Sequence, residues 1–187
     1  MKDITFITGN QGKANYLAKW LGIPMSHKKL DLDEIQSLDL QEVVEHKVRQ
    51  AYGRMQSPVL VEDVALTFTA MGRLPGTLIK WFLEELDVDG LCKLADGLQH
   101  RNAEAAIMYA LFDGKALHTF EAMVPGTIAA TPQDVHRDNS WAGSRSWNSI
   151  FIPQGATKTY AAMSDDELKP FSHRAQAIEK LKSYLQS

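Results

Sequence analysis

The chain has very little cysteine. Its only cysteine is Cys92, so no internal disulfide can form. No cluster of cysteine and histidine occurs at zinc spacing, and the local signature of a cysteine nucleophile is missing. These absences exclude a disulfide scaffold and argue against a small zinc domain or a thiol enzyme. They favour a reducing compartment, and we expect a cytoplasmic protein.

An excess of basic charge is also lacking. The chain has 20 Lys and Arg against 23 Asp and Glu, a net charge of -3, so no global field attracts nucleic acid or an anionic membrane. No apolar run approaches the roughly 18 residues of a membrane span. Met1 to Thr5 lack the apolar stretch of a signal peptide. We therefore expect no nucleic acid polymer and no membrane as partner, and any anion site must be local.

A run of aliphatic residues is the strongest strand signal in the chain. The whole chain of 187 residues, 44% hydrophobic and 23% charged, suits one globular domain. Val59 to Val61 follow Pro58 and predict a strand buried on both faces, which ends at Glu62 and Asp63. Ligands of an open α/β sheet bind at the carboxyl ends of its strands, where carboxylates can hold a hard cation. A solvated strand end is the alternative.

The N-terminal segment predicts a site for an anion. A strand over 4–7 leads into Thr8-Gly9-Asn10 and Lys13, and a helix follows over 14–21. Backbone N–H groups, the helix N-terminus and the lysine together attract a phosphate. The spacing matches neither a P-loop nor the three-glycine dinucleotide pattern, so an ordinary strand-to-helix turn remains open.

The remaining elements predict a mixed sheet. Helical periodicity covers 38–54, which carries Lys47, and also 77–86 and 88–98. Asp113-Gly114-Lys115 separates two strand-like runs, 103–112 and 116–124, as in a hairpin. The other predicted elements are strands at 24–32, 64–69 and 150–153 and loops at 71–76 and 134–146.

The C-terminal segment predicts two helix starts. Ser164 and Glu167 have the spacing of a capping box. Ser172 would cap a final helix over 172–185, which places His173 and Arg174 in its first turn. Cations are disfavoured there, so the pair indicates an anion or polar ligand nearby, with ordinary surface basicity as the alternative.

Six segments, in order and at similar spacing, resemble the inosine triphosphate pyrophosphatase family, also called the non-standard purine nucleoside triphosphate pyrophosphatases. The resemblance covers nearly the whole chain. It rests on Thr8-Gly9-Asn10 with Lys13, Glu34-Ile35-Gln36, Pro58 to Asp63, Leu74-Pro75-Gly76 with Lys80, Ser149 to Pro153, and Ser172-His173-Arg174.

The resemblance implies one elongated α/β domain over residues 1–187. Its two lobes would share a long central mixed sheet flanked by helices, with a substrate cleft between them and a homodimer as the assembly. It also implies hydrolysis of ITP, dITP and XTP with Mg²⁺, giving a nucleoside monophosphate and pyrophosphate.

The resemblance also assigns roles to residues. Glu34 and Asp63 would hold Mg²⁺, with Glu62 close by, and Asp63 would be the catalytic base. The substrate would be bound by Thr8, Gly9, Asn10, Lys13, Lys47, Lys80, Trp147, Asn148, Ser172, His173 and Arg174.

The sequence departs from the family in the segments that would contact the nucleobase. Arg145 replaces an aromatic residue, Asn148 replaces an aspartate, and Leu168 replaces a lysine, while Trp147 is kept. Two readings follow: an active pyrophosphatase with altered base preference, or a nucleotide-binding homologue with little turnover. Pyrophosphatases of other modified nucleotides, such as the Maf-like proteins, are a further alternative.

Overall fold

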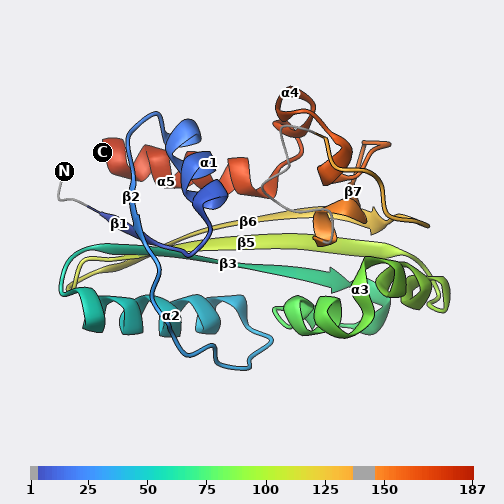
Figure 1. Cartoon of the computed structure of the whole chain (residues 1–187), viewed down its shortest axis with the longest axis horizontal. Coiled ribbons are helices and arrows are strands. Elements are labelled where there is room, and N and C mark those ends of the chain that lie inside the picture. Colours follow the sequence, from blue (N-terminus) through green and yellow to red (C-terminus); the bar gives the residue numbers. More distant parts are fainter. Residues whose placement is uncertain (1–3, 137–145) are drawn as a thin grey trace. The chain divides into compact units, whose positions relative to one another are not determined.

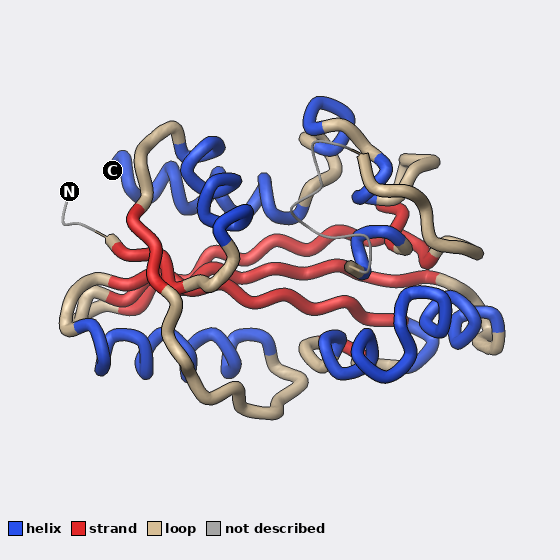
Figure 2. Tube along the Cα trace, in the orientation of Figure 1, coloured by secondary structure: helices blue, strands red, loops and turns tan. Residues whose placement is uncertain are grey.

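The protein has an open, mixed α/β sheet flanked by helices (Figures 1 and 2). The computed structural model describes residues 4–136 and 146–187. The seven strands follow the order β2-β1-β3-β5-β6-β7, and β4 pairs with β3 outside that path. Parallel and antiparallel pairs both occur, which confirms the predicted fold class.

The chain divides into two compact units, and the long strands β3, β5 and β6 contribute residues to both. Unit 1 comprises Met1–Asp63, Ile107–Ala122 and Arg174–Ser187, and unit 2 comprises Val64–Ala106 and Met123–His173. Each unit is described by itself below.

Unit 1 begins with two parallel β–α segments. β1 (Thr5–Ile7) is followed by α1 (Gln11–Leu21), and β2 (Ser26–Lys28) by α2 (Leu40–Met55). β1 pairs in parallel with both β2 and β3. β2 is shorter than the predicted strand over 24–32, because it lies at the sheet edge with all its side chains exposed.

β3 (Val59–Phe68) corrects a central prediction. Val59 to Val61 are completely buried, as predicted, but the strand does not end at Glu62 and Asp63. It continues through them for ten residues in all, so the two predicted strands are one. The acids interrupt the hydrophobic pattern but not the strand, because each pairs with basic side chains.

The predicted hairpin is confirmed as β5 (Asn102–Phe112) and β6 (Leu117–Ile128). In its turn, the Asp113 carboxylate accepts backbone hydrogen bonds from Lys115 and Ala116 at 2.8 and 2.9 Å. Gly114 has a φ of 92°, and a Cβ there would lie 2.1 Å from the Tyr52 hydroxyl. Only glycine fits this position without a clash.

β6 also extends four residues beyond the predicted end at Val124 (Ile128 against Val124). Pro125 cannot donate a ladder hydrogen bond, but its carbonyl accepts one from the Gln154 backbone at 2.9 Å. Gly126 then pairs with Pro153 of β7 (Phe151–Pro153). An edge partner therefore carries the strand past a Pro-Gly pair that usually breaks one.

Helix α3 (Ile79–Asp96) in unit 2 spans both predicted helices, and Asp87, at φ 57°, breaks it at the predicted boundary. Pro75–Gly76, predicted as loop, forms the short strand β4. The Ser164–Glu167 capping box is confirmed at α4 (Asp165–Leu168). Short 3-10 helices occupy Thr69–Met71, Trp147–Ser149 and Tyr160–Ala162.

Helix α5 (His173–Gln186) presents Ala175, Ile178 and Leu181 to the interior. Unit 2 has its own apolar core, which includes Phe68, Leu91 and Phe151. Among the described residues, no helix combines the length and apolarity needed to cross a membrane.

Candidate functional site

The predicted anion loop lies between β1 and α1 in unit 1. The Thr8 hydroxyl accepts a hydrogen bond from the Asn10 backbone at 3.1 Å. Asn10 is the N-cap of α1, and its side chain accepts from the Lys13 backbone at the same distance, 3.1 Å. Thr8 keeps its hydroxyl hydrogen as a donor. The loop therefore offers a helix N-terminus, a hydroxyl and the Lys13 ammonium to an anion.

The parallel register of β1 and β3 brings this loop to the central acids. Thr5 lies beside Val59 and Phe6 beside Leu60. Two further residues along the same register, Thr8 is level with Glu62, just past the end of β1. The carboxyl end of β1, where ligands of such sheets bind, therefore lies beside Glu62, although β3 itself continues.

Glu62 forms a buried ion pair on one face of β3. Its carboxylate forms ion pairs with Lys13, at 2.7 Å, and with Arg174, while its side chain is 4% exposed. Burial would raise the pKa of Glu62, but Arg174 and Lys13 outweigh that effect and hold the pKa below its ordinary value. Arg174 donates to the Tyr109 hydroxyl at 3.2 Å. The anion expected beside Arg174 is thus a carboxylate of the protein itself.

Asp63 pairs with Lys47 of α2. The Lys47 ammonium lies 3.0 Å from the Asp63 carboxylate and 3.3 Å from the Glu62 carbonyl oxygen. Burial would lower the pKa of Lys47, but Asp63, followed by Glu34 and Glu62, raises it above its ordinary value. Lys47 is therefore a charged, half-buried cation and not a solvated surface lysine.

The loop that carries Glu34 is held against α2. Gln50 accepts a hydrogen bond from the Asp33 backbone N–H at 3.1 Å and donates to the Asp33 carbonyl at 3.3 Å. Gln50 lies one helical turn from Lys47, which explains how the exposed Glu34 carboxylate comes within electrostatic range of that lysine.

Glu62 and Asp63 point in opposite directions because neighbouring strand residues alternate between faces. Glu62 meets Lys13 and Arg174 of α1 and α5, which cover one face of unit 1, and Asp63 meets α2 on the other (Figure 1). Across the described part of the chain, no three Asp, Glu, His or Cys side chains form a ready metal cluster. Glu62 therefore pairs with cations on the face of β3 opposite to Asp63.

The residues predicted for the nucleobase lie in unit 2, apart from Arg174. His173 stacks on Tyr160, with ring centroids 5.3 Å apart and planes within 6°, and also contacts Trp147 at 5.6 Å. Ser172, His173 and Trp147 are all buried. The Tyr160 hydroxyl donates to the Phe171 carbonyl at 2.9 Å. These side chains form a packed aromatic group, which we call the His173 stack (Trp147, Tyr160 and His173).

The positions that depart from the family differ in their surroundings. Asn148 is half-buried, and its backbone N–H bonds the Ser146 hydroxyl at 3.4 Å. Leu168 lies in the apolar core of unit 2, so a leucine there stabilises packing. Arg145 lies outside the described residues. Lys80 is exposed, with its ammonium 5.5 Å from the centre of the Trp81 ring.

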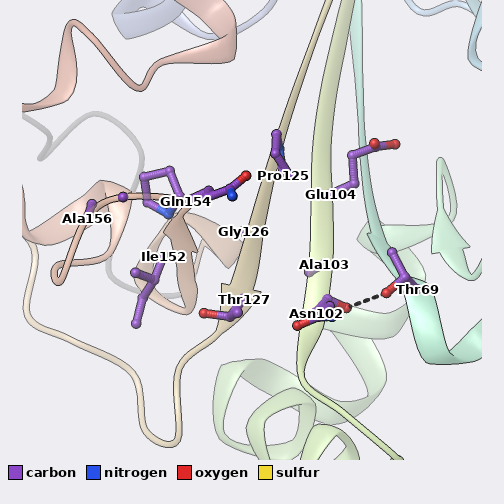
Figure 3. Close-up of a pocket in the computed structure, with 12 residues that line it drawn as sticks. Thr69, Asn102, Ala103, Glu104, Pro125, Gly126, Thr127, Ile152, Gln154 and Ala156 are labelled. Carbon is purple, nitrogen blue, oxygen red and sulfur yellow. Dashed lines mark hydrogen bonds between the residues drawn. The ribbon is translucent and has the colours of Figure 1, made fainter.

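A separate pocket of about 530 Å³ opens in unit 2 and contains none of the predicted site residues (Figure 3). Asn102 and Glu104 of β5 and Thr127 of β6 line it, with Gln154 beyond β7. The Thr69 hydroxyl donates to the Asn102 carbonyl at 3.1 Å across its floor. We do not take this pocket as the candidate functional site, because the Glu62 and Asp63 ion pairs lie in unit 1 and not beside it.

Three contributors to the site were missed from the sequence. Tyr109 looked like an ordinary strand aromatic, and Gln50 like an ordinary surface residue of a helix. Lys29 packs beside the anion loop, since a Cβ at Gly9 would lie 3.1 Å from its Cδ atom. In the sequence, Lys29 is marked only by its position shortly before Asp31 and Asp33.

The chain is similar to known proteins in both sequence and fold. The chain matches the Ham1 family over residues 4–184. It is 37% identical over 188 residues to the inosine triphosphate pyrophosphatase of Yarrowia lipolytica, covering 98% of this chain and 95% of the relative. The Schizosaccharomyces pombe inosine triphosphate pyrophosphatase is 36% identical, with 100% and 97% covered. The solved Coxiella burnetii HAM1 protein superposes with a TM-score of 0.82 at 20% identity, covering 100% and 99%.

The sheet topology and the charged groups beyond β1 define an α/β protein with paired acids and lysines gathered at the carboxyl end of β1. Matches over nearly the whole chain narrow that class. The chain belongs to the Ham1 family.

Proposed function

We propose that this protein hydrolyses non-standard purine nucleoside triphosphates such as ITP, dITP and XTP to the monophosphate and pyrophosphate. The observation that carries the proposal is the convergence of Lys13, Lys47 and Asp63 around the end of β1. Curated relatives over nearly the whole length are named inosine triphosphate pyrophosphatases. A triphosphate is strongly anionic, and the local cations offset its charge in a protein that is acidic overall.

In this proposal, unit 1 binds the phosphates. The ammonium groups of Lys13 and Lys47 attract them, and Thr8 and the α1 N-terminus, capped by Asn10, donate hydrogen bonds. Gly9 leaves the loop backbone accessible. Asp63 is the base that orients and deprotonates the attacking water, which adds to the α-phosphorus as the bond to the β-phosphate oxygen breaks. Lys47 fixes the Asp63 carboxylate through their 3.0 Å contact.

The donor set fits Mg²⁺. This ion takes oxygen ligands and is commonly held by one or two carboxylates together with substrate phosphates, so a three-carboxylate cluster is not required. Asp63 and Glu34 supply two carboxylates in the electrostatic range of Lys47. When bound, Mg²⁺ would stabilise negative charge that develops on the phosphates. We leave Glu62 out of this set because Lys13 and Arg174 occupy its oxygens.

We propose that Trp147, Asn148, Ser172, His173 and Lys80 contribute to base and substrate recognition. Asn148 supplies both a donor and an acceptor where relatives of this family type would have an acceptor alone. An altered base preference follows from that change. Asn148→Asp should shift the ITP/GTP ratio of kcat/KM toward ITP. An unchanged ratio would contradict a role for Asn148. Leu168→Lys is unsuitable here because it would bury a charge.

Three further expectations belong to this proposal. We propose that residues 1–187 act as one domain, supported by the three strands that both units share. We propose a homodimer, supported only by the family resemblance. We propose a cytoplasmic location, supported by the single buried cysteine.

The test is pyrophosphate release with Mg²⁺ over a panel of nucleotides: ITP, dITP, XTP, the four standard triphosphates and several modified bases. Hydrolysis of ITP and XTP above the standard nucleotides supports the proposal. Preference for another modified base would identify a re-specialised pyrophosphatase. Tight binding without release would support the nucleotide-binding homologue instead. Asp63→Asn controls for contaminating activity.

A further inference from the structure

Of the two lysines that we propose to bind phosphate and that pair with acids of β3, Lys13 has the more deeply buried partner. Its ammonium contacts Glu62 at 2.7 Å, and the Lys13 side chain stays 33% exposed while Glu62 is 4% exposed. A lysine has a flexible four-carbon stem and three N–H donors. An ion pair with a fixed carboxylate confines the stem to one place, while the ammonium group can still donate to an incoming anion.

Glu62 is itself rigidly held. Arg174 pairs with the second carboxylate oxygen, and the same guanidinium group donates to the Tyr109 hydroxyl at 3.2 Å. Tyr109 is 1% exposed, and its ring packs 6.3 Å from that of Phe6 in β1. The chain Tyr109–Arg174–Glu62–Lys13 therefore leads from the packed interior of unit 1 to the half-exposed ammonium group.

The charges of the Tyr109–Arg174–Glu62–Lys13 network leave an excess positive charge at its exposed end, the Lys13 ammonium group. Glu62 carries one negative charge, and Arg174 and Lys13 carry one positive charge each. Arg174 satisfies the buried carboxylate from the interior side. Glu62 therefore does not need Lys13 as a second cation for neutrality, and the Lys13 charge remains to attract an anion.

We propose that Glu62 is a positioning residue for Lys13: it fixes the ammonium group at the anion loop, and Arg174 and Tyr109 fix Glu62. This inference rests on the proposed function in one respect, since Lys13 is taken to bind the substrate phosphates. It gives Glu62 a role other than metal ligand. The alternative is that Glu62 serves only as a structural partner of Arg174. In that case its contact with Lys13 would have no effect on anion binding.

A double-mutant cycle tests the proposal through the binding of inorganic tripolyphosphate, measured by calorimetry without divalent cations. Glu62→Asp keeps the charge but withdraws the carboxylate from Lys13 by one methylene. We expect this change to weaken binding about tenfold when Lys13 is present and to have no further effect in a Lys13→Met background. Equal weakening in both backgrounds, or no weakening in either, overturns the proposal, as does a wild-type protein that fails to bind tripolyphosphate.

Tyr109→Phe provides a second route if Glu62→Asp fails to fold. It keeps the ring and every charge and removes only the hydroxyl that contacts Arg174. We expect roughly threefold weaker binding, again only when Lys13 is present. Glu121→Asp, the same shortening on an exposed strand position of unit 1, is the matched control and should leave binding unchanged.

The two proposals fail in different ways. A wild-type protein that binds tripolyphosphate but hydrolyses no nucleotide would defeat the proposed function, and the binding cycle would still decide the role of Glu62. A fully active enzyme whose cycle shows no coupling between Glu62 and Lys13 would defeat only the inference. In the active enzyme, Glu62→Asp should raise KM for every nucleotide by a similar factor, because all share the triphosphate.

Discussion

The two units differ in how they bury polar side chains. Unit 1 buries charge: Glu62 and Arg174 are paired in its interior, and Asp63 and Lys47 are paired nearby. Unit 2 instead buries the uncharged side chains of Ser149, Thr159 and Ser172 and places His173 among rings, stacked on Tyr160. Charged pairs suit the binding and reaction of phosphates, whereas stacked rings suit the recognition of a flat base. Under the proposed function, the phosphates and the base of the substrate would contact these two different kinds of interior.

Two consecutive residues, His173 and Arg174, show the same difference between the units. His173 belongs to unit 2 and contacts Trp147 and Tyr160, while Arg174 belongs to unit 1 and contacts Glu62 and Tyr109. One step along a helix rotates a side chain by about 100°. Two neighbouring residues can therefore have unrelated environments: His173 lies among aromatic rings, and Arg174 pairs with a carboxylate of the protein.

The largest effect should come from removing the charge that performs the chemistry. Asp63→Asn should lower kcat for ITP by about 10²- to 10⁴-fold, the range attributed to a general base, while the fold is kept. Pyrophosphate release and circular dichroism check these results. Asp89→Asn, an exposed aspartate in unit 2, is the matched control. Activity within threefold of the wild type would show that Asp63 is not the catalytic base and would contradict the assignment of the reaction to unit 1.

The next effect concerns the buried pair itself. Glu62→Gln leaves Arg174 buried without its counter-ion and should lower the free energy of unfolding by about 3–5 kcal/mol. The pKa of Glu62 is below its unfolded value of 4.5, so its contribution is present above that pH and is lost as the pH falls. Urea unfolding at pH 7 and pH 4 checks both points. A loss below about 1 kcal/mol, or one that grows as the pH falls, would contradict the account.

The aromatic side of the comparison predicts a smaller change. Trp147→Leu removes ring contacts with His173, Phe151 and Tyr160 and should lower the free energy of unfolding by about 1–3 kcal/mol. It should also raise KM for purine triphosphates, yet leave tripolyphosphate binding unchanged. Calorimetry beside kinetics separates the two results. Equal weakening of nucleotide and tripolyphosphate binding would contradict the proposal that the aromatic residues of unit 2 contact the base and unit 1 contacts the phosphates.

The smallest predicted effect sharpens the view of unit 2 as a rigid apolar core. Cys92 is 2% exposed, and burial raises the pKa of its thiol to about 11. Because the thiolate is the reactive form, the thiol should be inert to a disulfide reagent at pH 8 and should react fully after unfolding in urea. Thiol titration with and without urea measures this. Rapid reaction of the native protein would show that the core opens readily.

Local sequence signals predicted the elements whose causes are local. The hairpin at Asp113-Gly114 and the Ser164–Glu167 capping box follow from side chains that bond their own backbone, so neighbours in sequence were enough. The break at Asp87 also coincided with a change in helical periodicity. The α/β class followed from the order of these elements.

Long-range causes were not accessible from the sequence. Adjacent acids in the middle of a strand look like its end, because the cations that neutralise them come from other elements. Arg174 is 112 residues away from Glu62. The same limit concealed Tyr109. Local patterns singled out Glu62, Asp63 and Lys13. The roles of Glu34, Lys47 and Lys80 came from the family resemblance, and the division of Glu62 and Asp63 between two faces required the structure.

The products of ITP hydrolysis test the central claim most directly. Phosphorus NMR of the wild-type reaction with Mg²⁺ in ¹⁸O-labelled water identifies both the products and the atom attacked. The account predicts inosine monophosphate and pyrophosphate in equal amounts, with the label in the monophosphate and with the signal lost in Asp63→Asn. Inosine diphosphate with free phosphate, or label in the pyrophosphate, would contradict attack at the α-phosphorus and with it the proposed reaction.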